Sequence, residues 1–312
     1  MLRDMDKIRT AVIGVGYLGR HHARIYSELQ ESELVAVVDI VKERAEEIAR
    51  AYGCRAYIDY IDMLEKESPE AVSIAVPTSL HYEIAKECII RGINVLLEKP
   101  IATKLEHADE LFQLSKEKKV VFQVGYVERF NPIVSYLPRF VKEPFFIIAK
   151  RLTPFVNRNL DVGVVLDLMV HDIDIVLSLM KGEVEDVGGS GLSVVSPNED
   201  IASAYIRFKG GCSAYFIVSR VSPTSARELE MLDRNRKIVL NYMERELFVY
   251  DLDGLRTTEH IKLLSTEEPL EKELFNFINN VKRKQSSLND GRDSFCLALK
   301  ILESIRRDGK NV

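Results

Sequence analysis

The stretch that decides the fold is Ile8-Arg-Thr-Ala-Val-Ile-Gly-Val-Gly-Tyr-Leu-Gly19, followed by a helix-like segment and a second apolar run that stops at Asp39. Gly14 permits a tight turn, Gly16 has no Cβ and lets a ligand approach the backbone, and Gly19 lets the next helix pack close to the strand. The order of strand, glycine turn, helix, strand and acid is the one that binds a dinucleotide.

The same stretch carries the predicted cofactor contacts. Amide groups of the turn, which includes Tyr17 and Leu18, face the phosphates together with the positive end of the helix dipole. Asp39 is placed to accept hydrogen bonds from a ribose hydroxyl, and its charge disfavours a 2′-phosphate, so we expect NAD rather than NADP. Lys42 and Arg44 follow closely and weaken that expectation, although a solvated helix face is their simpler interpretation.

Composition excludes several classes of protein. A chain of 312 residues suggests two domains, since a domain typically has about 150 residues, and a hydrophobic share of 46% suffices for buried cores. A net charge of −5 with mixed signs predicts no nucleic-acid partner. The charged N-terminus does not resemble a signal peptide, and no apolar run reaches the length of about 18 residues that a membrane span needs. Four cysteines without metal-type spacing predict reduced thiols, no metal site and a cytoplasmic location.

Strands and helices alternate after Asp39 as far as residue 124, which predicts a parallel sheet with helices on both faces. Strands are expected at 71–76, 93–97 and 120–124, and helices at 41–52, 81–91 and 104–118. We therefore assign residues 1–124 to an NAD-binding Rossmann domain.

The pattern changes in residues 125–312. Strand-length segments follow one another at 201–208, 212–218, 228–232, 237–240 and 246–250, and Gly210-Gly211 is a hairpin signal. Two helices, at about 267–284 and 291–307, close the chain. These features predict an α+β domain with an open, mainly antiparallel sheet. One face of such a sheet needs helices, and the other is the expected contact of a homodimer or homotetramer.

Two strand ends of the first domain carry polar residues. Glu98-Lys99-Pro100 ends the strand 93–97, and ligands bind beyond the carboxyl ends of such strands. The Lys99–Pro100 bond is a candidate for the cis form. Pro77-Thr78 and His81 follow the preceding strand in the same way; Thr78 is a candidate helix cap or cofactor contact, and His81 either packs or touches a ligand.

The segment from Asp161 to Met180 is apolar nearly all round and predicts a buried helix. Four polar residues recur on it at i, i+4, i+7 and i+11, namely Asp167, His171, Asp174 and Ser178. A polar stripe on a buried helix must find partners or line a cavity. Two interpretations stay open: a structural network centred on Asp174 and Ser178, or an active site in which Asp167 orients His171 as a proton acceptor. Asp172 lies off the stripe and is expected to be a surface or interdomain charge.

Several residues near the expected domain junction suit an anionic substrate, although each is more often an ordinary ion-pair residue. They are Arg129, Asn131, Arg151 and Arg158.

Together these motifs resemble the glucose–fructose oxidoreductase, inositol dehydrogenase and rhizopine catabolism family, Gfo/Idh/MocA. The matching features are Gly14 to Gly19, Asp39, Pro77-Thr78 with His81, Glu98-Lys99-Pro100, and Asp167 with His171. The resemblance implies oxidation or reduction of a sugar or polyol carbon with NAD(P). It further implies that Lys99, Asp167 and His171 are catalytic. The residues that it implies for cofactor contact are the turn Gly14 to Gly19, Asp39, Pro77, Thr78, His81, Glu98 and Lys99.

A finer resemblance concerns Val-Gly-Tyr-Val-Glu-Arg-Phe-Asn-Pro132 and the stretch from Lys150 to Leu168. They look like the branch that includes UDP-N-acetylglucosamine 3-dehydrogenases, which oxidise the sugar 3-hydroxyl to a ketone. Arg151 or Arg158 would then contact a diphosphate. The alternatives are a polyol, inositol or free-sugar dehydrogenase, a binding protein that senses NAD without catalysis, and a redox-neutral use of bound NAD.

Overall fold

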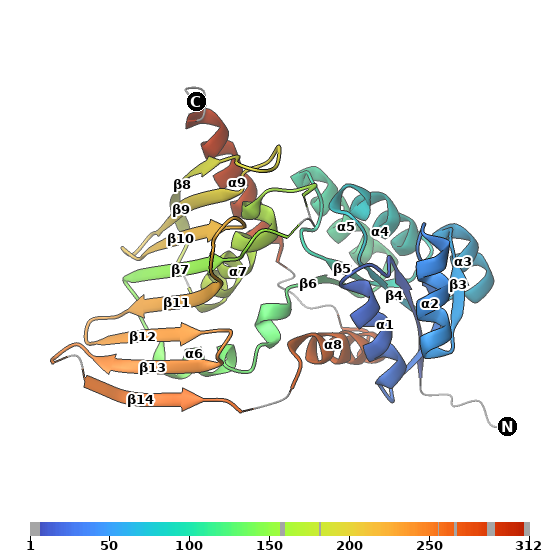
Figure 1. Ribbon diagram of the computed structural model, residues 1–312, viewed down its shortest axis with the longest axis horizontal. Helices are drawn as coiled ribbons and strands as arrows, with labels where there is room; N and C mark the ends of the chain where they lie inside the picture. Colours follow the sequence, from blue (N-terminus) through green and yellow to red (C-terminus); the bar gives the residue numbers. More distant parts are fainter. Residues whose placement is uncertain are drawn as a thin grey trace. The chain divides into compact units, whose positions relative to one another are not determined.

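The computed structural model describes residues 7–156, 160–180, 182–254, 256–264, 267–285 and 291–308, with the side chain of residue 308 left out. The chain forms two compact units, shown in Figure 1. Unit 1 consists of Met1–Gly125 with Leu270–Arg292, and unit 2 of Tyr126–Pro269 with Asp293–Val312.

Unit 1 contains a six-stranded sheet in the order β3-β2-β1-β4-β5-β6. Its strands are β1 (Ile8–Ile13), β2 (Ser32–Val38), β3 (Arg55–Tyr57), β4 (Ala71–Ile74), β5 (Asn94–Glu98) and β6 (Phe122–Gly125). Every neighbouring pair is parallel. Strands β4, β5 and β6 are buried on both faces, as central parallel strands are, whereas the short edge strand β3 is largely exposed. The predicted Rossmann fold is confirmed.

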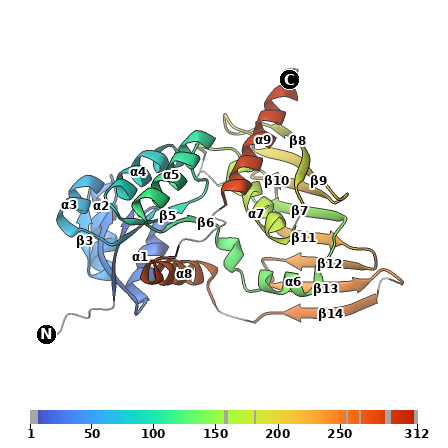
Figure 2. The ribbon, with the colours of Figure 1, turned by 180° about the vertical axis from the view of Figure 1, so that it is seen from behind.

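Five helices follow the strands of unit 1 in turn. They are α1 (Gly19–Glu28), α2 (Lys42–Tyr52), α3 (Tyr60–Glu67), α4 (His81–Ile90) and α5 (Leu105–Lys118). Asp59 caps α3 by accepting from the amides of Ile61 and Asp62, and Gly53 ends α2 in the left-handed region with φ of 70°. Figures 1 and 2 show α4 and α5 side by side along the sheet. Thr78 begins the 3-10 turn Thr78–Leu80 that leads into α4, and the N-cap residue of α4 is Leu80.

A sixth helix of unit 1 comes from far along the chain. Helix α8 (Pro269–Arg283) buries Leu274, Phe277 and Ile278 in the same core as Val12 of β1 and Tyr26 of α1. The helix itself was predicted, but the sequence assigned it to the second domain. Its amphipathic pattern shows that it packs on an apolar surface and does not say which one.

Unit 2 contains an eight-stranded sheet in the order β14-β13-β12-β11-β7-β10-β9-β8. Its strands are β7 (Phe146–Leu152), β8 (Val184–Leu192), β9 (Ile201–Phe208), β10 (Ser213–Ser219), β11 (Ala226–Leu232), β12 (Arg236–Asn241), β13 (Glu246–Asp251) and β14 (Arg256–Lys262). The pairing is antiparallel except between β7 and β10. Strands β9 and β10 form the hairpin that Gly210-Gly211 predicted. The predicted open, mainly antiparallel sheet is confirmed.

Helices cover one face of this sheet. They are α6 (Leu137–Phe140), α7 (Val170–Leu179) and α9 (Arg292–Asp308). Helix α9 packs on β8, where a Cβ added to Gly189 would lie 3.0 Å from Ile301 and one added to Gly191 3.1 Å from Ile305. Residues on β9 alternate between buried and exposed, so the second face of the sheet is open in the described chain.

Candidate active site

The glycine turn of unit 1 has the geometry that its spacing predicted. Gly14 has φ of +87°, and a Cβ there would lie 2.6 Å from the carbonyl oxygen of Ala75. A Cβ on Gly19 would lie 1.8 Å from the carbonyl oxygen of Gly14. A Cβ on Gly16 would meet nothing within 4 Å, so the protein itself does not require a glycine there. That pattern fits a position reserved for the close approach of a ligand.

The first turn of α1 also fits an anion. It contains no acidic residue, and no side chain caps it. Because the first amides of a helix point away from it and carry the positive end of its dipole, this end of α1 suits a pyrophosphate. Tyr17 and Leu18, the predicted contacts in the turn, are exposed.

Asp39 follows β2 at the same edge of the sheet, and its carboxylate is held by the backbone. Oδ2 accepts from the amide of Val15 at 3.1 Å, and Oδ1 accepts from the amide of Val41 at 2.9 Å. Nη1 of Arg44 contacts both oxygens, at 3.1 and 3.2 Å. Arg44 is exposed on α2, as the solvated-face interpretation expected, but its guanidinium also contacts Asp39, the residue predicted to bind the ribose.

The Lys99–Pro100 peptide bond at the end of β5 is cis, as predicted. The preceding residue, Glu98, has its carboxylate inside unit 1, where Oε1 lies 3.1 Å from Nε2 of the fully buried His22. A Cβ on Gly125 would lie 2.9 Å from the same carboxylate. The side chain of Glu98 thus supports the strand end that carries Lys99, and sequence reasoning missed His22 as its partner.

His81 holds two loops of unit 1 together. Its Nδ1 lies 2.8 Å from the carbonyl oxygen of Pro100, and its Nε2 lies 2.9 Å from that of Val76. Of the two interpretations that the sequence left open, the packing role is confirmed. Pro77 and Thr78 lie in the loop that His81 ties down, and Thr78 is buried.

In unit 2 the chain enters α7 through a π-helical turn, Val165–Met169. Asp167 lies in this turn and His171 in the first turn of α7, so the stripe predicted from helical spacing crosses a change of helix type. Such π turns occur frequently at functional sites. His171 is 8% exposed, and its ring meets the edge of the Tyr126 ring at a centroid distance of 6.3 Å.

The start of this turn is fixed by a carboxylate. Oε1 of Glu199 accepts from the amide of Val165 at 3.1 Å, and a Cβ on Gly163 would lie 2.0 Å from the same oxygen. Burial raises the pKa of Glu199 above its ordinary value. Glycine at position 163 therefore leaves the space that lets Glu199 reach the helix start.

The prediction that Asp172 is a surface or interdomain charge is wrong. Asp172 is 1% exposed, not a surface charge, and Arg151 is equally buried. Arg151 donates to both oxygens of Asp172 at 2.9 and 2.8 Å and to Glu128 at 2.8 Å. Because it is buried and three of its N–H groups donate to these carboxylates, Arg151 is an ion-pair residue of unit 2, the simpler of the two interpretations that the sequence offered.

The pKa values of this cluster differ in direction. Burial raises the pKa of Asp172, and the attraction of Arg151 does not fully offset it. Burial would also raise the pKa of Glu128, but Arg151 and Arg227 outweigh it and lower the pKa.

Arg129 and Asn131 are also engaged inside unit 2. Arg129 donates from Nε and Nη2 to the two oxygens of Asp174, and Ser294 donates to Asp174 at 2.7 Å. Asn131 is buried and donates to Glu128 at 3.2 Å. Asp174 thus belongs to a structural network, as one interpretation expected. Ser178 does not, because its hydroxyl donates to the carbonyl of Ile175 in its own helix. Arg158 lies outside the described residues.

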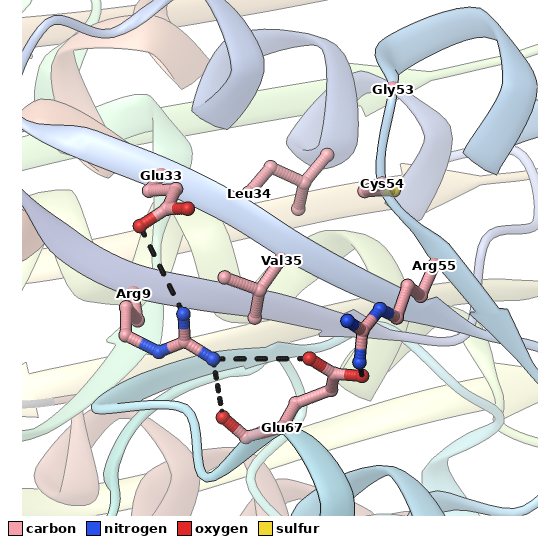
Figure 3. A pocket seen from close by; sticks show the side chains of 8 residues that line it. All are labelled: Arg9, Glu33, Leu34, Val35, Gly53, Cys54, Arg55 and Glu67. Carbon is pink, nitrogen blue, oxygen red and sulfur yellow. Dashed lines mark hydrogen bonds and ion pairs between the residues drawn. The ribbon is translucent and has the colours of Figure 1, made fainter. Parts of the chain in front are cut away.

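A separate hollow of about 280 Å³ lies at the opposite end of the unit 1 sheet, where β1 begins (Figure 3). Arg9 and Arg55 line it, and both pair with the buried carboxylate of Glu67. The glycine turn follows the other end of β1, so this hollow is not part of the predicted cofactor site. Within the described ranges, no helix is long and apolar enough to span a membrane, and no group of three metal-ligating side chains occurs.

Comparison with known families and proteins covers both units. Residues 8–126 match the model described as the oxidoreductase family with an NAD-binding Rossmann fold, and residues 141–236 match the GFO/IDH/MocA C-terminal domain. UDP-N-acetylglucosamine 3-dehydrogenase of Acidithiobacillus ferrooxidans is 33% identical over 296 residues, which are 92% of this chain and 93% of that enzyme. The NAD(+)-dependent scyllo-inositol 2-dehydrogenase of Bacillus subtilis is 30% identical over 70% of this chain and 68% of its own length.

Solved structures share the same architecture. The A. ferrooxidans enzyme superposes with a TM-score of 0.88 at 32% identity, covering 96% of this chain and 98% of that one. A levoglucosan dehydrogenase in complex with NADH superposes with a TM-score of 0.84 at 21% identity, covering 97% of this chain and 98% of that one, and shares the fold.

Proposed function

The chain belongs to the GFO/IDH/MocA oxidoreductase family, and from this membership we propose that it transfers a hydride between a nucleotide-sugar carbon and NAD, converting a 3-hydroxyl to a 3-ketone. The similarity to UDP-N-acetylglucosamine 3-dehydrogenase carries the proposal, because it extends through both units at 33% identity over 92% of the chain. The similarity to the scyllo-inositol enzyme covers only 70%.

The residues of unit 1 fit a nicotinamide dinucleotide, which would supply the hydride acceptor when bound. The uncapped first turn of α1 would hold the pyrophosphate beside Gly16, where space is open. Asp39 would accept from the adenosine ribose, and the supported end of β5 would present Lys99. NAD remains the proposed cofactor, since a carboxylate at the end of β2 suits a 2′-hydroxyl.

The residues of unit 2 would act on the substrate hydroxyl. We assign His171 as the group that accepts the hydroxyl proton, and Asp167, in the turn before it, as the carboxylate that orients His171 and the substrate. Lys99 would donate a hydrogen bond to the same oxygen and stabilise negative charge that develops there. Which of Lys99 and His171 is the base stays open.

Two features bear on the substrate and on assembly. With Arg151 committed to an internal ion pair, Arg158 is the remaining arginine proposed to contact a diphosphate. A homodimer or homotetramer through the open face of the unit 2 sheet stays a proposal, supported by the exposed Tyr215 and Ile217 on β10.

The substrate is tested by following NADH formation with UDP-N-acetylglucosamine, free N-acetylglucosamine, myo-inositol and scyllo-inositol. We expect turnover with the nucleotide sugar, and we expect Arg158→Ala to raise its KM while leaving the KM for NAD unchanged. Efficient oxidation of an inositol without turnover of the UDP-sugar would support the inositol dehydrogenase alternative. Tight NAD binding without turnover of any substrate would support the NAD-sensing alternative.

A further inference from the structure

Arg44 covers the carboxylate that a bound dinucleotide would need for its ribose. We propose that Arg44 is a specificity-determining residue that makes the ribose subsite accept a 2′-phosphate as well as a 2′-hydroxyl, so that the protein uses NADP as a second cofactor. This inference rests on the proposed function, since it requires a dinucleotide at the glycine turn.

Asp39 does not need Arg44 to stay in place. The amides of Val15 and Val41 each bind one carboxylate oxygen, and the residue is only 6% exposed. Two contacts from Nη1 of Arg44 fill the acceptor positions that the amides leave, because a carboxylate has about four. A ribose hydroxyl can therefore bind Asp39 only where Arg44 gives up its contacts.

The contact between Arg44 and Asp39 has a geometry that is easily broken. A single nitrogen straddles both oxygens at 3.1 and 3.2 Å, instead of two nitrogens donating in parallel as in a fork-like pair. The side chain is 43% exposed, so water is ready to solvate the guanidinium when it leaves. Arg44 can thus move from Asp39 without disturbing the buried structure.

The surrounding charges favour an anion next to Arg44. Arg20, in the first turn of α1, donates to the carbonyl of Gly16 at 3.2 Å, one residue beyond the amide that binds Asp39. No acidic residue lies in that turn. Glu43 is the acidic residue in the first turn of α2, and it is exposed. Asp39 alone would repel a 2′-phosphate, but the guanidinium offsets this charge and donates to phosphate oxygens.

NAD and NADP would then contact the Asp39–Arg44 pair in different ways. With NAD, Arg44 swings out and Asp39 accepts from the ribose hydroxyls. With NADP, Arg44 stays beside Asp39 and binds the 2′-phosphate. Removing the guanidinium should weaken the binding of NADP, whereas the binding of NAD should stay nearly unchanged or become slightly tighter, because Asp39 is then open to the ribose.

The test measures NADH and NADPH affinity by fluorescence titration, which does not depend on turnover, for the wild-type protein, Arg44→Ala and Arg44→Gln. Lys42→Ala is the matched control, because it removes the same charge from the same helical turn and its Nζ pairs with Glu46 at 3.7 Å rather than with Asp39. We expect Arg44→Ala to raise the Kd for NADPH by about tenfold or more while the Kd for NADH changes by less than about threefold. Arg44→Gln should fall between, and Lys42→Ala should keep the wild-type ratio.

An unchanged NADH to NADPH ratio in Arg44→Ala, or a wild-type protein that binds NADH and no NADPH, would overturn the role of Arg44 while leaving the proposed function intact. A wild-type protein that binds neither dinucleotide would overturn both. Kinetic ratios of kcat/KM for the two cofactors should follow the binding ratios once a substrate is identified.

Discussion

The guanidinium of Arg151 on β7 binds the carboxylate of Asp172 on α7 through two parallel hydrogen bonds of 2.9 and 2.8 Å. Both side chains are buried, and Glu128 completes the cluster at 2.8 Å. Asp172 directly follows His171, so this ion pair fixes the helix turn that presents the proposed proton acceptor. The cluster is a structural anchor for the start of α7, which carries His171.

Removing the cation should therefore cost stability. Arg151→Met removes the bidentate partner of Asp172 and leaves Glu128 with the more distant Arg227 at 3.6 Å, and we expect the free energy of unfolding in urea to fall by about 3–5 kcal/mol. Arg50→Met is the control, because Arg50 is exposed on α2 and lies 4.0 Å from Glu46. The control should change stability by less than about 0.5 kcal/mol. Equal effects of the two variants would contradict the anchoring role.

Asp200 in unit 2 gives stability a predicted dependence on pH. Burial would raise its pKa, but the amides of Val195, Val194 and Ser196 and the hydroxyl of Ser196 outweigh burial and lower it to about 2. Since the folded-state pKa lies below the unfolded value of about 3.9, the ionised group stabilises the fold above that value and loses this contribution as pH falls toward 2.

Asp200→Asn should thus lower the free energy of unfolding at neutral pH by about 1.5–3 kcal/mol. The difference from wild type should shrink between about pH 4 and pH 2. Urea unfolding at several pH values measures it. A difference that stays constant down to pH 2 would show that the charge of Asp200 contributes nothing.

The glycines of the turn should separate folding from cofactor binding. Gly19→Ala forces a Cβ to within 1.8 Å of the Gly14 carbonyl oxygen, so we expect a loss of about 1–3 kcal/mol in stability. Gly16→Val meets open space and should keep the wild-type melting temperature, yet raise the Kd for NADH at least about tenfold. Thermal unfolding and fluorescence titration check both. Tight NADH binding by Gly16→Val would mean that the dinucleotide does not approach this backbone.

The glycine turn could be predicted from the sequence because a tight turn without room for a Cβ restricts positions 14 and 19 to glycine. The same holds for the apolar parallel strands of unit 1 and for the β9–β10 hairpin at Gly210-Gly211, whereas the short, exposed β3 has no apolar run and was not predicted. The partners of individual side chains are harder to predict from the sequence. Whether Arg151 points to a ligand or to Asp172 depends on which strand faces α7, and a single sequence does not state that.

The sequence does contain a signal for the buried partner of Asp172. A helix that is apolar nearly all round has no solvated face, so a charge off the polar stripe, Asp172, needed a buried cation. Arg44 carries no such signal, since an arginine at the start of a helix usually faces water. The placement of α8 on unit 1 depends on contacts with strands more than a hundred residues earlier in the sequence.

Assembly through the open sheet is tested on β10. Tyr215 and Ile217 are 41% and 45% exposed, and Tyr215 lies in a ring cluster with Phe146 and Tyr205. We expect Ile217→Lys to shift the gel-filtration mass toward the 35.6 kDa monomer. Ile58→Lys, at an exposed isoleucine of unit 1, should keep the wild-type mass. A wild-type protein that already elutes as a monomer would contradict assembly through this face.

The measurement that tests the central claim most directly is NADH formation from UDP-N-acetylglucosamine by the wild-type protein, Lys99→Met and His171→Asn. His260→Ala is the control, since His260 is an exposed ring stacked on Phe248 at 4.2 Å. We predict that both site variants still bind NADH and lose about a hundredfold or more in kcat, while the control retains wild-type turnover. Near-normal turnover by both Lys99→Met and His171→Asn would contradict the account.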